Sequence, residues 1–238
     1  MRALCVLHDA FSTTGLIGES LRARGWQVDE ALIVPAGRYD TPNVDFSFPD
    51  HREYDLLVPM GAPWSAYDEA TVGRWLVPEL DWLARAATSG GAVFGICFGA
   101  QALCAALGGR VEAMERKEIG WTMVDSADPE LIPAGPWLEF HGDRCLPPPR
   151  AAVLARNGAG VQAFRLGGHL AVQFHPEVDG PQLKRWLDAG GRADAERAGL
   201  DPDRFLADTI REEPAARRRA GRLVAAAIGL RPTGEEEP

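Results

Sequence analysis

The stretch Gly95-Ile96-Cys97-Phe98-Gly99-Ala100 follows a short apolar run and opens a helix-like segment. A turn of the form G-x-nucleophile-x-G needs glycine at both ends, because larger side chains would collide with the strand and the helix that the turn joins. The pattern predicts that Cys97 stands on a strand-to-helix turn, beside the amide N–H of Phe98 and the N-terminus of a helix. Both features stabilise a thiolate and a nearby oxyanion, so Cys97 is the expected nucleophile.

A second motif, Gln173-Phe174-His175-Pro176-Glu177, lies at the end of the last strongly apolar segment. His175 can exchange a proton near neutral pH, and Glu177 can accept a hydrogen bond from the other ring nitrogen. This spacing predicts a general base and the carboxylate that orients it. Cys97, His175 and Glu177 therefore form the expected catalytic set.

The surrounding segments alternate between strand-like and helix-like patterns. Apolar runs at residues 3–7, 31–34 and 54–59 have the length of buried strands, and helical spacing over residues 67–88 precedes the strand that delivers Cys97. This alternation predicts an α/β fold with a mostly parallel sheet and helices on both of its faces. The carboxyl ends of parallel strands share one edge, so the nucleophile turn and the glycine-containing segment after residue 59 should meet there.

The C-terminal third of the chain changes character. Residues 160–174 have the pattern of a hairpin closed by Gly167-Gly168, which would carry His175 to the site. We expect the main domain to cover residues 1–187, followed by a helical extension over residues 188–238. The extension should contain one short helix with Phe205, Leu206 and Ile210, a second helix that begins near Pro214, and a frayed acidic end. Its arginine cluster is interpreted as a solvated helix face, with phosphate binding as the alternative. The cluster comprises Arg217, Arg218, Arg219 and Arg222.

The motifs together resemble the class I, or triad-type, glutamine amidotransferases. GICFGAQ is similar to the family's nucleophile elbow and FHPE to its base and orienting carboxylate. Residues 60–64 resemble the glycine-rich oxyanion loop, residues 118–121 a short motif after the elbow helix, and residues 141–143 a loop that contacts substrate. They occur in the family's order over about residues 3–187. The resemblance implies the flavodoxin-like fold of that family.

The resemblance also implies a reaction. The Cys97 thiolate would attack the γ-carboxamide of glutamine, with His175 protonating the departing ammonia, and water would release glutamate from the thioester. The oxyanion would be held by the amide N–H groups of Phe98 and of Ala62 or its neighbour Gly61. The resemblance implies neither a cofactor nor a metal ion.

Four further positions match the family's substrate contacts. Gln101, His141, Gly142 and Asp143 are expected to bind the α-carboxylate and α-ammonium groups of glutamine. Each of the polar residues also has a purely structural interpretation: a helix-surface position for Gln101, a loop-shaping role for His141 and a turn cap for Asp143.

Two positions depart from the family pattern. Ala62 stands where many relatives have the second glycine of Gly-Gly-Pro, and alanine would resist any activating turn through positive φ. Phe140 stands where some relatives carry a polar residue that contacts glutamine, so the contacts to the α-groups are expected to differ.

Composition excludes several classes of protein. The formal charge of −9 argues against nonspecific binding to nucleic acid or to an anionic membrane, and no apolar run reaches the ~20 residues of a membrane span. No signal peptide is visible, and the four cysteines lack metal-finger spacing, so reduced thiols in the cytoplasm are expected. The remaining histidines, His8, His51 and His169, are interpreted as surface or loop residues. The tryptophans at 75, 82 and 186 are interpreted as core.

The acceptor of the ammonia is not encoded in any motif of the chain. A P-loop and an ATP-pyrophosphatase motif are both missing from the sequence, so the resemblance points to a stand-alone, GMP-synthase-like amidotransferase whose synthetase partner is a separate subunit. One alternative is a catabolic hydrolase of γ-glutamyl amides or peptides. Another is a non-catalytic, partner-binding module of the same fold. Whether the chain forms a homodimer is left open.

Overall fold

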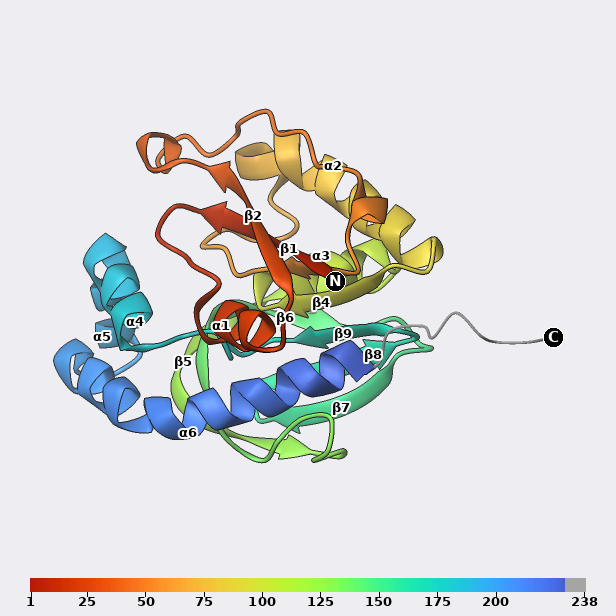
Figure 1. Ribbon diagram of the computed structural model, residues 1–238. Coiled ribbons are helices and arrows are strands. Elements are labelled where there is room, and N and C mark those ends of the chain that lie inside the picture. Colours follow the sequence, from red (N-terminus) through yellow and green to blue (C-terminus); the bar gives the residue numbers. More distant parts are fainter. Residues whose placement is uncertain (230–238) are drawn as a thin grey trace.

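The computed structural model describes residues 1–229, in which helices cover both faces of a single nine-stranded sheet (Figure 1). The strands are β1 (Arg2–Asp9), β2 (Gln27–Val34), β3 (Leu56–Pro59), β4 (Ala92–Ile96), β5 (Arg110–Ser126), β6 (Gly135–Leu146), β7 (Ala152–Asn157), β8 (Gly160–Leu166) and β9 (His169–Val172). The helices are α1 (Gly15–Ala23), α2 (Glu69–Thr88), α3 (Phe98–Ala106), α4 (Gly180–Trp186), α5 (Arg192–Arg197) and α6 (Pro202–Gly229), with short turns η1 (Ala36–Arg38), η2 (His51–Glu53) and η3 (Leu187–Gly191).

The sheet has the strand order β2-β1-β3-β4-β9-β8-β7-β5-β6. The first five strands in this order are parallel, as the alternating pattern predicted. The other four pairings are antiparallel, so the sheet is mixed and the expected parallel arrangement holds for one half of it. The hairpin of β8 and β9 across Gly167-Gly168 is confirmed, and it is the point at which the two halves join.

Strand β1 shows how the sheet fills two layers, because its side chains alternate between the faces. Ala3, Cys5 and Leu7 pack in one core cluster with buried side chains of α1 and α6. Leu4 and Val6 pack in the opposite cluster with buried side chains of α2 and α3. The expected helices on both faces are therefore present.

Parallel order gathers the predicted motifs at one edge. Strands β1, β3, β4 and β9 are consecutive neighbours in the sheet, and each ends immediately before or within a segment that carries polar or glycine residues. These segments contain Asp9, Gly61, Cys97 and His175. The expectation that the nucleophile turn and the glycine-containing segment share an edge is confirmed.

Helix α6 differs from the two short helices that the sequence suggested. It is one helix of 28 residues that continues through Pro214, which lies on its exposed side. Buried residues on both sides of the proline keep helical spacing, so packing of that face outweighs the lost backbone hydrogen bond. The C-terminal half of α6 packs against α1 and belongs to the same core cluster as β1. Residues 234–238, expected to be frayed, lie outside the described part of the chain.

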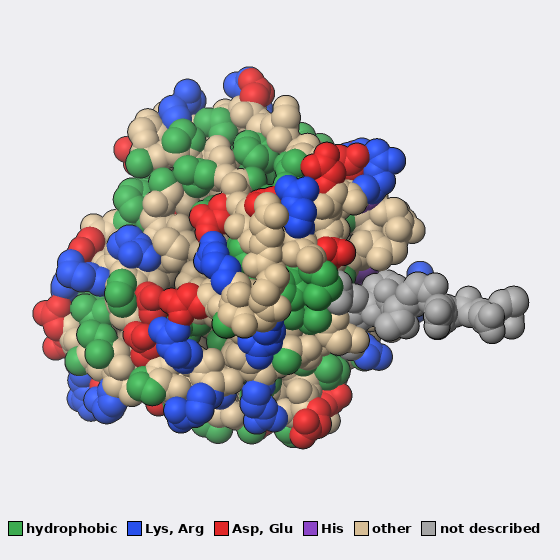
Figure 2. Space-filling view, viewed as in Figure 1, with side chains coloured by type: hydrophobic (Ala, Val, Ile, Leu, Met, Phe, Trp, Pro, Cys, Tyr) green, Lys and Arg blue, Asp and Glu red, His purple; other side chains and the backbone are tan. Residues whose placement is uncertain are grey.

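The arginine cluster of α6 is largely engaged with neighbouring groups. Arg217 pairs with Glu19 of α1 and with Glu213, and Arg219 pairs with Glu212 while its guanidinium lies over Trp137. Figure 2 shows basic and acidic side chains interspersed over this face of the molecule. This arrangement supports the interpretation of the arginine cluster as a solvated, ion-paired helix face. Among the described helices none is both long and apolar enough to cross a bilayer.

The packing of α6 predicts its effect on stability. Leu223 is fully buried against α1, so we expect Leu223→Ala to lower the free energy of unfolding by about 2–5 kcal/mol. The matched control is Arg218→Ala, at an exposed position on the same helix. This substitution should change the free energy of unfolding by no more than about 0.5 kcal/mol. Urea unfolding followed by circular dichroism measures both. A near-zero effect of Leu223→Ala would show that the extension over residues 188–238 folds separately from residues 1–187.

Candidate functional site

Cys97 occupies the predicted strand-to-helix turn between β4 and α3. Its φ of 50° and ψ of −108° are strained, and no other non-glycine residue among residues 1–229 has a positive φ. The turn is closely packed: a Cβ atom on Gly99 would lie 2.0 Å from the carbonyl oxygen of Pro59, and one on Gly95 would lie 2.6 Å from the carbonyl oxygen of Gly99. Both glycines are therefore required by contact with neighbouring backbone, as the G-x-C-x-G pattern predicted.

His175 and Glu177 form a buried, hydrogen-bonded pair. The distance from His175 Nδ1 to Glu177 Oε1 is 2.8 Å, which leaves Nε2 of the ring for the nucleophile. Burial alone would lower the pKa of His175, but the charges of Cys97 and Glu177 and the hydrogen bonds to both raise it well above its usual value. The Glu177 carboxylate thus favours the protonated form of the His175 imidazole.

Gly61 brings the glycine-containing segment against the same two residues. A Cβ atom at this position would lie 2.9 Å from His175 Cε1 and 3.9 Å from Cys97 Cβ, so only glycine fits. Ala62, the next residue, lies outside the positive-φ region. The backbone here adopts its conformation without the second glycine that many relatives have.

A chain of amide side chains connects the nucleophile to β6. Gln173 donates to Cys97 Sγ at 3.6 Å, and its Oε1 accepts from Gln101 Nε2 at 3.2 Å. Gln101 also lies 3.4 Å from the carbonyl oxygen of Asp143. No role was predicted for Gln173, although this residue begins the motif that contains His175. Gln101 is buried rather than on a helix surface.

His141, Gly142 and Asp143 lie within strand β6 rather than in the expected loop, next to a bulge in its pairing with β5. All three line the cavity. The carboxylate of Asp143 accepts hydrogen bonds from the hydroxyls of Ser65, at 2.6 Å, and Tyr67, at 3.0 Å. A strand fixes these groups more firmly than a loop would, because the ladder holds the backbone on both sides of the bulge.

His141 is held between two carboxylates. Its Nε2 lies 3.2 Å from Glu118 Oε2 and 3.1 Å from Glu139 Oε2. Burial would lower the pKa of His141, but Glu118 and Glu139 raise it to about 10, while burial raises the pKa of Glu139 to about 7. Within residues 1–229 these side chains are the one group of three or more His, Cys, Asp or Glu residues whose ligand-capable atoms all lie within 4.8 Å of one another. The imidazole N–H already occupies the space between the carboxylates.

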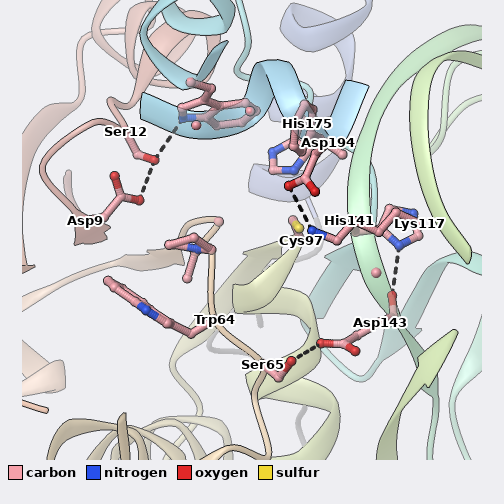
Figure 3. Close-up of a pocket in the computed structure, with 18 of the residues that line it drawn as sticks. Asp9, Ser12, Trp64, Ser65, Cys97, Lys117, His141, Asp143, His175 and Asp194 are labelled. Atoms are coloured by element: carbon pink, nitrogen blue, oxygen red, sulfur yellow. Dashed lines mark hydrogen bonds and ion pairs between the residues drawn. The ribbon is translucent and has the colours of Figure 1, made fainter. Parts of the chain in front are cut away.

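The site opens into a cavity of about 580 Å³, a size typical of small-molecule sites. In Figure 3, Asp143 and Ser65 lie on one side of Cys97, and Asp9 and Trp64 lie on the other. Lys117 and Asp194 form an ion pair of 2.9 Å on its wall. This ion pair connects β5 to α5, two elements that no sequence pattern had related to each other.

The interpretations of three residues need correction. Trp186 is only partly buried: it packs against the core cluster around α4 but also lines the cavity, where its ring packs edge-on against His175 with centroids 4.8 Å apart. His8 and His169 are buried rather than on the surface. The helical spacing of Trp186 could not show that its helix covers the end of β9, because that contact joins separate elements. Trp75 and Trp82 are core, as expected.

The burial of the cysteines predicts a selective alkylation. Cys97 lines the cavity, whereas burial raises the pKa of Cys5 to about 12 and the pKa of Cys145 lies well above its usual value because of Cys104 and burial. We expect iodoacetamide to label Cys97 before the other three thiols, as measured by peptide mass spectrometry over time. Prior labelling of Cys104 or Cys145 in the native protein would contradict the assignment of the nucleophile.

The cluster around His141 predicts a pH dependence. Because the pKa of His141 is about 10 when folded and about 6.5 when unfolded, its proton stabilises the fold fully below pH 6.5. This contribution is lost as the pH rises toward 10, so the free energy of unfolding should fall across that window. NMR of the ring Cε1–H group should show His141 still protonated at pH 8, and Glu139→Gln should move its midpoint to lower pH. A midpoint near 6.5 in both proteins would refute the charged assignment.

Comparison with known proteins agrees with this geometry. The family described as glutamine amidotransferase class-I matches residues 44–189, more than half of the chain. Curated relatives named GMP synthase [glutamine-hydrolyzing] include those of Allorhizobium ampelinum, 37% identical over 139 residues, and Bdellovibrio bacteriovorus, 30% identical over 183 residues. The matches cover 52% and 75% of this chain but only 25% and 33% of those relatives, so the chain spans about a quarter to a third of their length.

Solved structures agree over nearly the whole chain. A glutamine amidotransferase from Thermotoga maritima has a TM-score of 0.81 and 25% identity, covering 96% of this chain and 98% of its own. The glutamine amido transferase from Methylobacillus flagellatus has the same fold, with a TM-score of 0.80 and 23% identity, and the comparison covers 100% of this chain and 98% of that one. Because the family matches most of the chain and includes the segments that carry Cys97 and His175, this protein belongs to the class-I glutamine amidotransferases.

Proposed function

We propose that the chain hydrolyses the γ-amide of glutamine through a thioester on Cys97, giving glutamate and ammonia. The observation that carries this proposal is the convergence of a strained cysteine turn, a Glu177-oriented His175 and the Gly61 backbone at one end of the cavity. These are the parts that acyl transfer by a thiol needs: a nucleophile, a proton carrier and donors for an oxyanion.

The proposed reaction has two steps. Cys97 Sγ attacks the γ-carbonyl carbon, and as the carbon–nitrogen bond breaks, the proton on His175 passes to the departing ammonia. His175 then takes a proton from water, which attacks the thioester carbon and releases glutamate and the thiolate. During both steps the amide N–H groups of Phe98 and Ala62 would donate to the oxyanion, where each well-placed donor is worth about 3 kcal/mol.

The substrate's α-groups would bind on the Asp143 side of the cavity. Asp143 supplies a carboxylate for an ammonium group, and its two hydroxyl partners orient it. The backbone N–H groups near Gly142 suit a carboxylate, whereas both ring nitrogens of His141 are already engaged, by the carbonyl oxygen of Asp143 and by Glu118 and Glu139. Gln101 would act mainly by holding the Asp143 carbonyl and Gln173, since its amide N–H group is directed to both.

We further propose that the ammonia serves a separate synthetase partner. The relatives' name joins glutamine hydrolysis to GMP synthesis, and this chain matches only a part of their length. A partner could act on the segments at the cavity's edge, which include Trp64 and the residues after α4.

A hydrolase of substituted γ-glutamyl amides is the second candidate. Asp9 and Trp64 also line the cavity, on the side of Cys97 away from Asp143 (Figure 3). Ammonia would not fill this space, but a larger amine leaving group would. The retained, well-formed Cys97–His175–Glu177 set argues against the third alternative, a non-catalytic binding module.

Steady-state assays separate these functions. We expect release of ammonia from glutamine that is weak in the isolated chain, rises when a candidate synthetase is added and disappears in Cys97→Ala with the fold intact by circular dichroism. A partner-free kcat/KM above about 10⁴ M⁻¹s⁻¹ on a substituted γ-glutamyl amide would instead establish the catabolic hydrolase. Activity that survives in Cys97→Ala would overturn the proposed mechanism.

A further inference from the structure

A second histidine–glutamate pair lies behind the site, in a position that the proposed mechanism does not use. His8, near the end of β1, and Glu79, in the middle of α2, both have fully buried side chains. Nε2 of His8 lies 3.0 Å from Glu79 Oε1 and 3.2 Å from Oε2. Apolar residues of similar volume would fill this layer with a smaller desolvation cost, so packing alone does not account for this pair.

The other ring nitrogen of His8 reaches the Gly61 backbone. His8 Nδ1 lies 3.2 Å from the carbonyl oxygen of Gly61, the residue that contacts His175 and Cys97. A carbonyl oxygen can only accept, so Nδ1 carries a proton and donates it, while Nε2 shares a proton with the Glu79 carboxylate. Glu79 thereby fixes both the position of the ring and the presence of a proton on Nδ1.

This hydrogen bond sets the direction of the peptide that follows Gly61. No peptide bond among the described residues is cis, so the N–H of Ala62 points opposite to the carbonyl of Gly61. The carbonyl points into the protein interior toward His8, and the N–H of Ala62 therefore points toward the cavity. The ring of His8 also packs edge-on against Phe98, with centroids 4.6 Å apart, so it contacts Phe98 as well as the carbonyl of the Gly61–Ala62 peptide.

The side chain of Ala62 favours the same orientation. Reversing the Gly61–Ala62 peptide would rotate φ of Ala62 by about half a turn, from its present region into the positive-φ region that alanine avoids. Alanine in place of the second glycine of Gly-Gly-Pro thus favours the orientation in which the N–H of Ala62 points toward the cavity. The sequence alone had suggested that this alanine would hinder that orientation.

We propose that His8, oriented by Glu79, is a positioning residue for the oxyanion hole: its Nδ1–H holds the carbonyl of Gly61 so that the N–H of Ala62 faces the reacting carbonyl. The inference rests on the proposed function. Without this bond only the φ preference of Ala62 holds the peptide, so its N–H can tilt away from the reacting carbonyl and stabilise the developing negative charge less well.

The test compares two double variants that leave no buried charge unpaired. His8→Leu/Glu79→Leu removes the donor and fills the layer with apolar groups. His8→Asn/Glu79→Gln keeps a side-chain N–H in place for the Gly61 carbonyl. Cooperative urea unfolding confirms that each variant is folded before its activity is measured.

Three readouts follow each variant. The kcat and KM for glutamine hydrolysis report the proposed reaction, and acylation of Cys97 by p-nitrophenyl acetate reports oxyanion stabilisation without requiring recognition of glutamine. Alkylation of Cys97 by iodoacetamide forms no oxyanion, so it reports the thiolate alone. Wild-type protein that is acylated but does not hydrolyse γ-glutamyl amides would refute the proposed function while the role of His8 is still measured.

We expect the leucine pair to lower kcat and the acylation rate by about 10²-fold or more, the effect of removing one oxyanion donor, with KM and the alkylation rate nearly unchanged. The asparagine pair should recover most of the loss. A folded leucine pair that acylates at the wild-type rate would overturn the proposal. So would an equal loss of acylation and alkylation, or no recovery with asparagine, because a merely structural role gives those results.

Discussion

Backbone contact between the nucleophile turn and its neighbouring strands is the constraint on which the site depends. Gly99 lies against the carbonyl of Pro59 and donates to the carbonyl of Met60, and the N–H of Cys97 donates to Val172 at the end of β9. The strained conformation at Cys97 persists because strands on both sides hold it. One of those strands leads to Gly61 and the other to His175, so the same contacts that impose the strain also fix Cys97 relative to His175 and to the Gly61 backbone.

Three buried histidines surround this turn, and the carboxylate group of at least one glutamate orients each of them. His175 pairs with Glu177, His141 lies between Glu118 and Glu139, and His8 pairs with Glu79. Burying such pairs opposes folding unless their geometry is good, so their concentration around one cysteine marks a functional centre rather than a stabilising device. The three groups serve different purposes in our proposal: proton transfer, support of the wall that carries Asp143, and support of the peptide that stabilises the oxyanion.

The two halves of the sheet contribute different groups to the site. The parallel half supplies the reacting groups, because the ends of β1, β3, β4 and β9 meet at one edge. The antiparallel half supplies the wall that carries His141 and Asp143, whose positions depend on the bulged pairing of β5 with β6. Helix α6 packs across the opposite face from the cavity-forming helix α3, where it shares a core cluster with α1 and β1.

The sequence by itself determined the nucleophile turn, the His175–Glu177 pair and the parallel half of the sheet, since each follows from local spacing: glycines around a cysteine, a two-residue gap, and apolar runs of strand length. The tertiary structure alone decided the contacts of His8, Glu79 and Trp186, because their partners lie on separate elements that spacing along the chain cannot relate. It also decided that α6 passes through Pro214 as one helix and that residues 141–143 form a strand. In both cases, long-range packing and pairing outweighed the local preference.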